Sequence, residues 1–391
     1  MQQKTYQHSE HHVSRHAIDP DAIAIIQRLQ QAGFTAYLVG GGVRDLLLGL
    51  HPKDFDISTS AHPQQIKALF PHNCILIGRR FRLAHLRYGK KILEVATFRA
   101  GDPSTSSLIV RDNTWGTEEE DVLRRDFTIN ALFYDPSTEE IIDYVNGFQD
   151  IQHHLLKTIG NPTARFKQDP VRMIRLLKFQ ARFAFHYEKP TLSALHHCRE
   201  EILKSSPARL LEEMMKMLES GKAAPFFQLL TEHQFLEYLF PCFQYFFARP
   251  EKETPFVYLK ALDSMHTKTL HRPTRLAALI FPILEQELKI LQKDRQHPVS
   301  LRLITQLAKT LTQGINTSSF VHFPKKLISS ALYAIIEQFR IAPQGKIPKR
   351  HLRFHSKEES TYAIELLQLR TIITPQLAPV LSYWQEKLFN A

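Results

Sequence analysis

Up to about residue 145, short apolar runs alternate with amphipathic segments, a pattern typical of a mixed domain of strands and helices. Gly33 follows the first amphipathic segment, at a position where glycine commonly ends a helix. The stretch 99–113 is polar and is expected to form a mobile loop. The predicted elements are, in order, a helix over 22–32, a strand over 35–39, a helix over 43–48, a strand over 55–59, a helix over 63–70, and strands over 74–77, 83–88 and 92–98.

From residue 162 onward the apolar positions recur with the helical period of about 3.6 residues. Apolar residues between Val171 and Phe185 line one face of a predicted helix, whereas Arg172 and Arg175 line another. The stretch 225–247 is rich in Phe and Leu and is expected to be buried. The sequence therefore predicts an α+β protein, with an N-terminal domain of strands and helices followed by an all-α remainder.

Length and composition are those of a globular protein. At roughly 150 residues per domain, 391 residues correspond to two or three domains. No apolar run is long enough to span a membrane, and the polar, His-rich start does not resemble a signal peptide. The three cysteines stand far apart, so we expect a reduced, cytoplasmic protein. The formal net charge of +11 favours a polyanionic partner such as nucleic acid.

Three consecutive glycines, 40–42, follow the strand over 35–39. Backbone N–H groups at Gly41 and Gly42 can approach a phosphate without obstruction by side chains. Arg44 comes soon after them and could pair with phosphate oxygens. A turn that binds no ligand would explain the glycines equally well, so the loop indicates phosphate binding only together with the residues near it.

Asp54 and Asp56 follow this loop and flank Phe55. On a strand, residues two apart point to one face, so the two carboxylates are predicted to lie close together. Their mutual repulsion would be relieved by Mg²⁺, which binds one or two carboxylates together with phosphate oxygens. Two acids in a solvated turn are the alternative.

Two further acids are candidates for the same site. Glu94 lies in an otherwise apolar strand and would need a partner there, either a metal ion or an arginine such as Arg82 or Arg99. Arg125 and Asp126 are adjacent, so one could meet a triphosphate and the other a ribose hydroxyl; a capped turn with an internal salt bridge is the alternative.

Asp169-Pro-Val-Arg172 begins the helix described above. An acid and a guanidinium exposed together at a helix start can offer an acceptor and two donors to the edge of a base. Asp169 could equally be the N-cap of the helix, with Pro170 at the first helical position.

These motifs, in this order and spacing, resemble those of the class II nucleotidyltransferases, the family of bacterial poly(A) polymerases and CCA-adding enzymes. The resemblance covers about residues 10 to 215. It rests on Gly41-Gly-Val-Arg-Asp45, Asp54-Phe-Asp56, Glu94-Val-Ala-Thr-Phe-Arg99, Arg124-Arg-Asp-Phe-Thr-Ile-Asn-Ala131 and Asp169-Pro-Val-Arg172.

The resemblance implies a polymerase-β-like head of mixed sheet and helices, followed by all-α neck, body and tail domains. The corresponding boundaries are an N-terminal extension over 1–20, a catalytic head over 21–160, a neck over 161–220 and a body and tail over 221–391. It also implies catalysis by Asp54, Asp56 and Asp126, Mg²⁺ held by Asp54, Asp56 and Glu94, nucleotide binding by Gly41, Gly42, Arg44 and Arg125, and reading of the base by Asp169, Arg172 and Arg175.

One stretch bears on the choice within the family, and one residue departs from the family's usual pattern. Ile77-Gly-Arg-Arg-Phe-Arg-Leu-Ala-His85 is similar to a stretch that marks the poly(A) polymerases, and Arg79, Arg80 and Arg82 are predicted to contact RNA, with a solvated basic turn as the alternative. Gln168 stands where family members commonly have an acid, so it keeps an acceptor and loses a charge.

The sequence thus predicts template-independent addition of AMP from ATP to RNA 3′ ends, with Mg²⁺ as cofactor. A CCA-adding enzyme and a catalytically silent RNA-binding protein are the alternatives. RNA chaperones or nucleases are candidate partners, and we expect a monomer.

Overall fold

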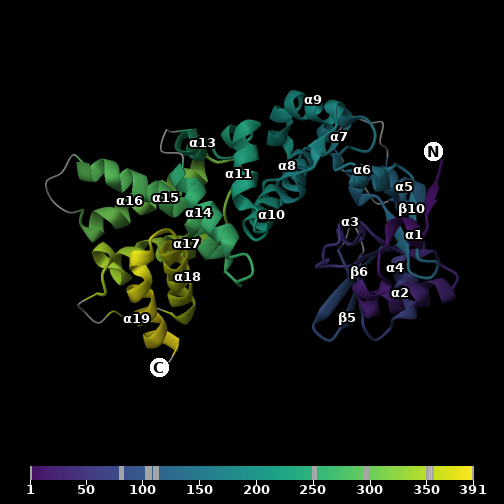
Figure 1. Ribbon diagram of the computed structural model, residues 1–391, viewed down its shortest axis with the longest axis horizontal. Coiled ribbons are helices and arrows are strands. Elements are labelled where there is room, and N and C mark those ends of the chain that lie inside the picture. The colour runs from purple at the N-terminus through teal and green to yellow at the C-terminus, as the bar shows by residue number, and fades with distance from the viewer. Residues whose placement is uncertain are drawn as a thin grey trace. The chain divides into compact units, whose positions relative to one another are not determined.

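The computed structural model describes residues 2–78, 83–101, 108, 114–248, 253–293, 299–348, 352, 354 and 356–389. The chain divides into two compact units, Met1–Glu201 and Ile202–Ala391, which run from purple to teal and from teal to yellow in Figure 1. The finer boundaries predicted at residues 20, 160 and 220 stay predictions.

An eight-stranded sheet forms the centre of the first unit, with the order β1-β10-β9-β2-β3-β6-β5-β4. Neighbouring strands are antiparallel except β3 and β6, which run parallel. The first of these strands lies in the segment predicted as an N-terminal extension, so part of that segment belongs to the sheet. The strands are β1 (Lys4–Tyr6), β2 (Ala36–Val39), β3 (Asp56–Thr59), β4 (Cys74–Ile77), β5 (Leu83–Tyr88), β6 (Lys91–Thr97), β9 (Phe133–Asp135) and β10 (Glu140–Asp143).

Each helix and strand predicted before residue 98 is confirmed. The first of the predicted helices is α2 (Pro20–Gln31). It begins where the Asp19 side chain accepts the N–H of Asp21, and it is followed by Gly33 at a φ of +85°. The helix predicted over 43–48 starts two residues earlier, as α3 (Gly41–Leu47), because two of the three glycines form its first turn.

The polar stretch after β6 was predicted as a loop from residue 99, and this was wrong at its start. Strand β7 (Arg99–Ala100) pairs with β8 (Thr114–Trp115). Pairing is possible here because the backbone of Arg99 continues directly from β6 and its N–H is held by the Asp121 carboxylate, 3.1 Å away. Residues 102–107 and 109–113 of the predicted loop lie outside the described residues.

The two faces of the sheet are covered differently. Helices α2 and α4 (Pro63–Leu69) pack on one face, over apolar residues such as Val95. The other face is covered in part by α5 (Glu118–Leu123), whose Val122 joins a buried cluster with Tyr37 and Phe133. Beyond that cluster, the second face is open over β6, where Glu94 is exposed while Val95 is buried.

Helices α7 (Pro162–Gln168) and α8 (Val171–Phe183) end the first unit together with α6 (Gly147–Gln152) and α9 (Lys189–His197). The predicted apolar face of α8 is confirmed as buried. The expectation that Arg172 is exposed at the start of α8 was wrong: it is only 6 % exposed, because backbone of the α5 and α7 region accepts hydrogen bonds from its guanidinium.

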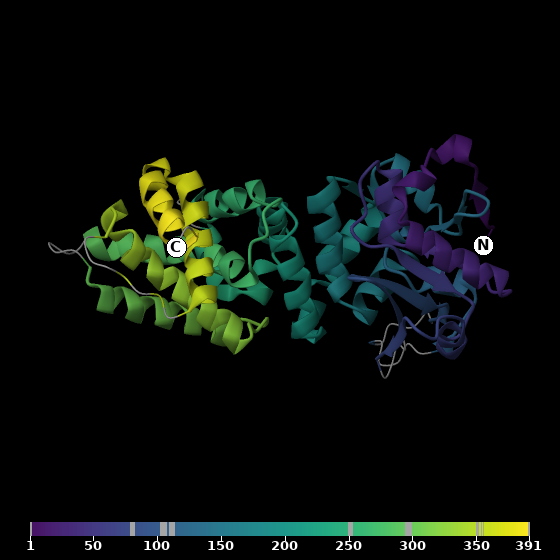
Figure 2. The ribbon, with the colours of Figure 1, turned by 90° about the horizontal axis from the view of Figure 1, so that it is seen from below.

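The regular elements among the described residues of the second unit are all helices (Figure 2). The stretch 225–247 contributes buried phenylalanines, as predicted. Near the C-terminus, the buried Trp384 donates its Nε1–H to the carbonyl of Ile341, 2.9 Å away. The helices of this unit are α10 (Pro207–Leu218), α11 (Ala223–Glu232), α12 (Leu236–Leu239), α13 (Pro241–Ala248), α14 (Glu253–Ser264), α15 (Arg272–Lys293), α16 (Leu301–Ser318), α17 (Lys325–Ile341), α18 (Lys357–Ile373) and α19 (Ala378–Phe389).

Among the residues that the structure describes, no helix combines the length and the apolar character needed to cross a bilayer.

Candidate active site

The glycine loop brings three predicted site segments together. Gly40 ends β2 with a φ of +70°, and a Cβ on it would lie 3.3 Å from Nη1 of Arg125. A Cβ on Gly42 would lie 3.3 Å from the carbonyl oxygen of Asp54. Contacts this close leave little room for side chains, so glycine lets the start of α3 approach both neighbours.

Asp54 and Asp56 are both exposed, one just before β3 and the other as its first residue. They flank the half-buried Phe55, and because Asp54 lies outside β3, their predicted placement on one face stays a prediction. Two exposed carboxylates beside a glycine loop make a negatively charged edge that can bind a cation.

Glu94 lies in the neighbouring strand. The parallel register pairs Ile57 with Val95, so one residue earlier Asp56 faces Glu94 and both side chains point to the same side of the sheet. Glu94 was predicted to be buried, and this was wrong: its side chain is 49 % exposed, because this face is open over β6. Glu94 forms an ion pair with His85 of β5, at 3.3 Å.

The described residues contain no group of three or more His, Cys, Asp or Glu side chains already arranged to hold a metal ion. Of the acids that the sequence assigned to a metal, Asp54 and Asp56 are exposed near the glycine loop, and Glu94 lies next to Asp56 in the strand register. Hard carboxylate oxygens are the donors that Mg²⁺ prefers, and this ion completes its coordination with phosphate oxygens and water. The donor set therefore fits Mg²⁺.

Arg125 lies over the same face as Asp56. Its Nη2 donates to Oγ of Ser58 at 3.3 Å, and Ser58 shares a face with Asp56 because it is two residues further along β3. Its Nη1 lies 3.4 Å from the carbonyl oxygen of Asn130. The guanidinium is therefore held between the sheet and the glycine loop.

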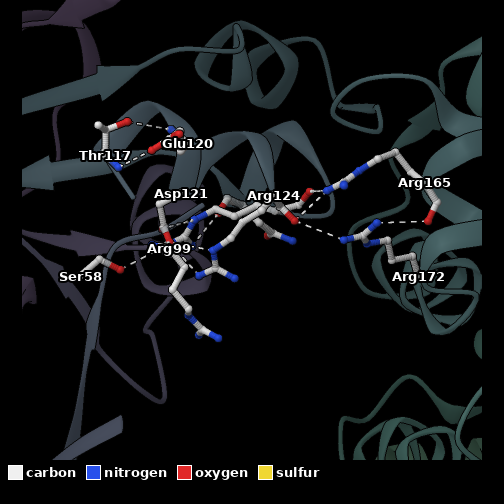
Figure 3. Close-up of polar contacts among 10 residues, drawn as sticks. Ser58, Arg99, Thr117, Glu120, Asp121, Arg124, Arg165 and Arg172 are labelled. Atoms are coloured by element: carbon white, nitrogen blue, oxygen red, sulfur yellow. Dashed lines mark hydrogen bonds and ion pairs between the residues drawn. The ribbon is translucent and has the colours of Figure 1, made fainter. Parts of the chain in front are cut away.

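Asp121, which the sequence did not single out, holds Arg125 in this position (Figure 3). Its carboxylate is fully buried: Oδ1 accepts from Arg124 at 2.7 and 2.8 Å, and Oδ2 accepts from Arg125 at 2.8 and 3.2 Å. Burial by itself would raise the pKa of Asp121, but the two arginines outweigh it and hold that pKa below its ordinary value. The spacing of this acid, three and four residues before two arginines, was the signal available in the sequence.

Arg44 is buried beneath the loop. It donates to Oδ1 of Asp45 at 2.6 and 2.9 Å and also to Oδ1 of Asn130. Its guanidinium lies over the ring of Phe183, 4.8 Å from the centroid. Burial lowers the pKa of Arg44, while the neighbouring Asp45 opposes that shift. Arg44 thus supports the underside of the loop, and its predicted contact with phosphate stays a prediction.

Asp126 is paired with Arg175 of α8. Burial alone would raise the pKa of the Asp126 carboxyl, but Arg175 and hydrogen bonds from Asn130 and from the N–H of Phe127 hold that pKa well below its usual range. The predicted catalytic acid and one predicted base-reading arginine therefore contact each other.

Arg172 and Arg165 donate to main-chain carbonyls. Arg165 contacts the carbonyl oxygens of Arg124 and Arg125, and Arg172 contacts those of Arg165 and Arg124 (Figure 3). The amide oxygen of Gln168 accepts from Arg165 at 2.8 Å, so the prediction that this residue keeps its acceptor role is confirmed.

The remaining predictions concern Asp169 and the three arginines between residues 79 and 82. Asp169 is half-buried and ends α7, while α8 begins at Val171, so the residue lies between the two helices. Arg79, Arg80 and Arg82 lie outside the described residues.

Known proteins resemble both parts of the chain. Residues 36–157 match the model for the poly A polymerase head domain, and residues 184–247 match that for the probable RNA and SrmB-binding site of polymerase A. Poly(A) polymerase I of Salmonella typhimurium is 35 % identical over 96 % of this chain and 84 % of its own length.

CCA-adding enzymes are also similar. The enzyme of Lactobacillus helveticus is 37 % identical over 55 % of this chain and 54 % of its own length. The crystal structure of the Bacillus stearothermophilus CCA-adding enzyme in complex with CTP covers 95 % of this chain and 82 % of that one, with a TM-score of 0.65 and 27 % identity. Similarity to a poly(A) polymerase over nearly the whole chain, with the motifs gathered around one face of the sheet, shows that the protein belongs to the poly(A) polymerase family.

Proposed function

We propose that the protein is a template-independent polynucleotide adenylyltransferase. The 3′-hydroxyl oxygen of an RNA attacks the α-phosphorus of ATP, the bond to the β-phosphate oxygen breaks, and the RNA gains one AMP while pyrophosphate leaves. The observation that carries this proposal is that the glycine loop lies against the main chain of Asp54 and against Arg125, whose guanidinium lies over the face of the sheet that carries Asp56.

Asp54 and Asp56, with Glu94 beside them, would hold Mg²⁺. When bound there, Mg²⁺ would lower the pKa of the attacking hydroxyl and neutralise charge on the leaving pyrophosphate. Glu94 takes the third place in this proposal because it shares the face of Asp56, whereas Asp126 is engaged by Arg175.

The triphosphate would lie against the glycine loop. Backbone N–H groups at the start of α3, together with the positive end of that helix, can contact its oxygens. Arg125 reaches the same place from the opposite side and can add a charge-assisted hydrogen bond. Base selection is assigned to the start of α8, where Asp169, Arg172 and Arg175 lie close to the segment that carries Arg125.

The acceptor is proposed to be an RNA 3′ end. The net charge of +11 and the match of residues 184–247 to a probable RNA-binding region support this choice. We also propose that the protein acts as a monomer in the cytoplasm. A single monomeric mass in solution during sedimentation would agree with the first part, and a stable dimer would contradict it.

Addition of CCA to tRNA is the second candidate, supported by the structural similarity to a CCA-adding enzyme. The extent of the sequence matches favours polyadenylation, because the poly(A) polymerase relative matches 96 % of this chain and the CCA-adding relative 55 %.

Nucleotide choice separates the two candidates. The purified protein is incubated with Mg²⁺ and either an unstructured RNA or a tRNA lacking its terminal CCA, first with ATP alone and then with CTP and ATP. Long tails of A on the unstructured RNA support the proposal, and products that stop after C, C and A overturn it. A protein that binds RNA without releasing pyrophosphate would be the silent alternative.

A further inference from the structure

Helix α5 presents one buried acid to two arginines in a fixed register. Its first turn is closed by Thr117 and Glu120, which accept each other's backbone N–H at 3.3 and 2.7 Å. Asp121 follows Glu120 and forms ion pairs with Arg124 and Arg125, which come three and four residues later in the chain. The acid side chain is 1 % exposed, against 18 % and 16 % for the two arginines.

The main chain of the two arginines is held from a different direction. Arg165 and Arg172 donate to the carbonyl oxygens of Arg124, and Arg165 also donates to that of Arg125 (Figure 3). These contacts do not involve Asp121. Removing the charge of Asp121 should therefore release the arginine side chains while their backbone keeps its place.

Arg125 is the partner of Asp121 that reaches the candidate active site. The same Nη2 that contacts Asp121 at 2.8 Å also lies 3.3 Å from Oγ of Ser58, on the face that carries Asp56. The opposite atom, Nη1, lies beside the glycine loop. Asp121 itself is fully buried and contacts the arginines rather than solvent.

We propose that Asp121 is a positioning residue for nucleotidyl transfer. It keeps the guanidinium of Arg125 aimed between the glycine loop and the sheet, where the triphosphate is bound, and its effect on the reaction passes through that arginine, while its contacts with Arg124 and the N–H of Arg99 hold the surrounding structure. A buried carboxylate suits this task because it offers two oxygens to two guanidinium groups and relieves the repulsion between them. The inference rests on the proposed function, because it assigns the triphosphate to the site next to Arg125.

A double-mutant cycle tests this inference. Asp121→Asn, Arg125→Ala and the double variant are compared with the unaltered protein for kcat and KM with ATP in Mg²⁺-dependent AMP incorporation. Asp121→Asn should lower kcat/KM by about tenfold to a hundredfold, mainly through a higher KM, because the arginine contacts bound triphosphate. The double variant should be no more impaired than Arg125→Ala alone.

Glu118→Gln is the matched control. Glu118 lies on the same helix but accepts hydrogen bonds from Tyr37 and Tyr144, at 3.2 and 3.1 Å, so this variant loses a charge without touching Arg125. It should keep the kcat/KM of the unaltered protein. A comparable loss in Glu118→Gln would mean that any charge change on α5 suffices, and the inference would be wrong.

Other outcomes are equally decisive. If the fold-losses in kcat/KM of the two single variants multiply in the double variant, the inference is wrong while the proposed function stands. An unaltered protein that incorporates no AMP would overturn the proposed function itself. If Asp121→Asn does not fold, Asp121→Glu takes its place in the cycle, since it keeps the carboxylate but displaces it by one methylene; a loss that persists in the absence of Arg125 would again contradict the proposal.

Discussion

Asp126 and Arg175 form a close ion pair, in which Nε and Nη2 of the arginine lie 2.7 and 2.6 Å from the same carboxylate oxygen, Oδ2. The other oxygen, Oδ1, accepts from Asn130 and from the N–H of Phe127. The pair joins α8 to the segment that follows Arg125. This arrangement gives the carboxylate a structural task, whatever else it does in the reaction.

Arg175→Ala should leave a buried, uncompensated carboxylate and lower the free energy of unfolding at pH 7 by about 3 kcal/mol. The pKa of Asp126 is depressed in the folded protein, so the stabilisation is fully present above the unfolded value of about 3.9 and is lost as the pH falls toward the folded pKa. In Arg175→Ala only Asn130 and the N–H of Phe127 still oppose the effect of burial, so the pKa of Asp126 rises and the difference between the two proteins in urea unfolding should shrink as the pH falls from 8 toward 5. A difference that grows as the pH falls would contradict the depressed pKa.

Asp54→Ala should lower AMP incorporation by at least about a hundredfold, because losing even a supporting residue of a metal site can cost that much. The thermal unfolding midpoint should change little, since Asp54 is exposed. Glu386→Ala, an exposed acid of α19, is the control and should keep full activity. Normal incorporation by Asp54→Ala would remove the metal assignment.

Gly42→Ala should displace the segment at Asp54, because the new Cβ would lie 3.3 Å from its carbonyl oxygen. A shift of a few tenths of an ångström should reduce kcat by up to about tenfold. Gly314→Ala is the matched control: this glycine lies inside α16 with no atom within 4 Å of the new Cβ, so it should stabilise the protein by about 0.5–1 kcal/mol. Equal activity in both variants would mean that the close approach at Gly42 does not matter for the reaction.

Gln168→Leu should destabilise the protein by about 1–3 kcal/mol, because the buried guanidinium of Arg165 would lose an acceptor. Gln168→Glu keeps an acceptor and adds a charge opposite that arginine, so it should be tolerated far better. Chemical unfolding of the two variants provides the comparison. If both lose the same stability, the contact with Arg165 is not what Gln168 contributes.

The sequence predicted those parts of the site that depend on local spacing. The strand, glycine loop and helix around Gly41 were predictable because a glycine run after a β-type run has few structural meanings. The strand that begins at Asp56 was predictable from its short β-type run, whereas the shared face of Asp54 and Asp56 stays a prediction. Both predictions needed only residues close together in the chain.

What could not be predicted was which side of each element is covered. Glu94 was predicted to be buried because its neighbours in the sequence are apolar, yet one face of β6 is open at this residue. Arg172 was expected at the surface, but distant carbonyls surround it. Such outcomes depend on contacts between segments tens of residues apart, which periodicity does not report.

The parallel pairing of β3 with β6 ties the candidate metal site to strand alignment. Asp56 and Glu94 come from segments separated by α4, β4 and β5, and they become neighbours only through the ladder that matches Ile57 with Val95. Because side chains alternate along a strand, a slip by one residue would turn Glu94 to the covered side. Insertions or deletions in the segments between β3 and β6 would preserve this alignment. One residue inserted within β6 ahead of Val95 would instead turn Glu94 away from the site, although the sequence would still contain every acidic residue.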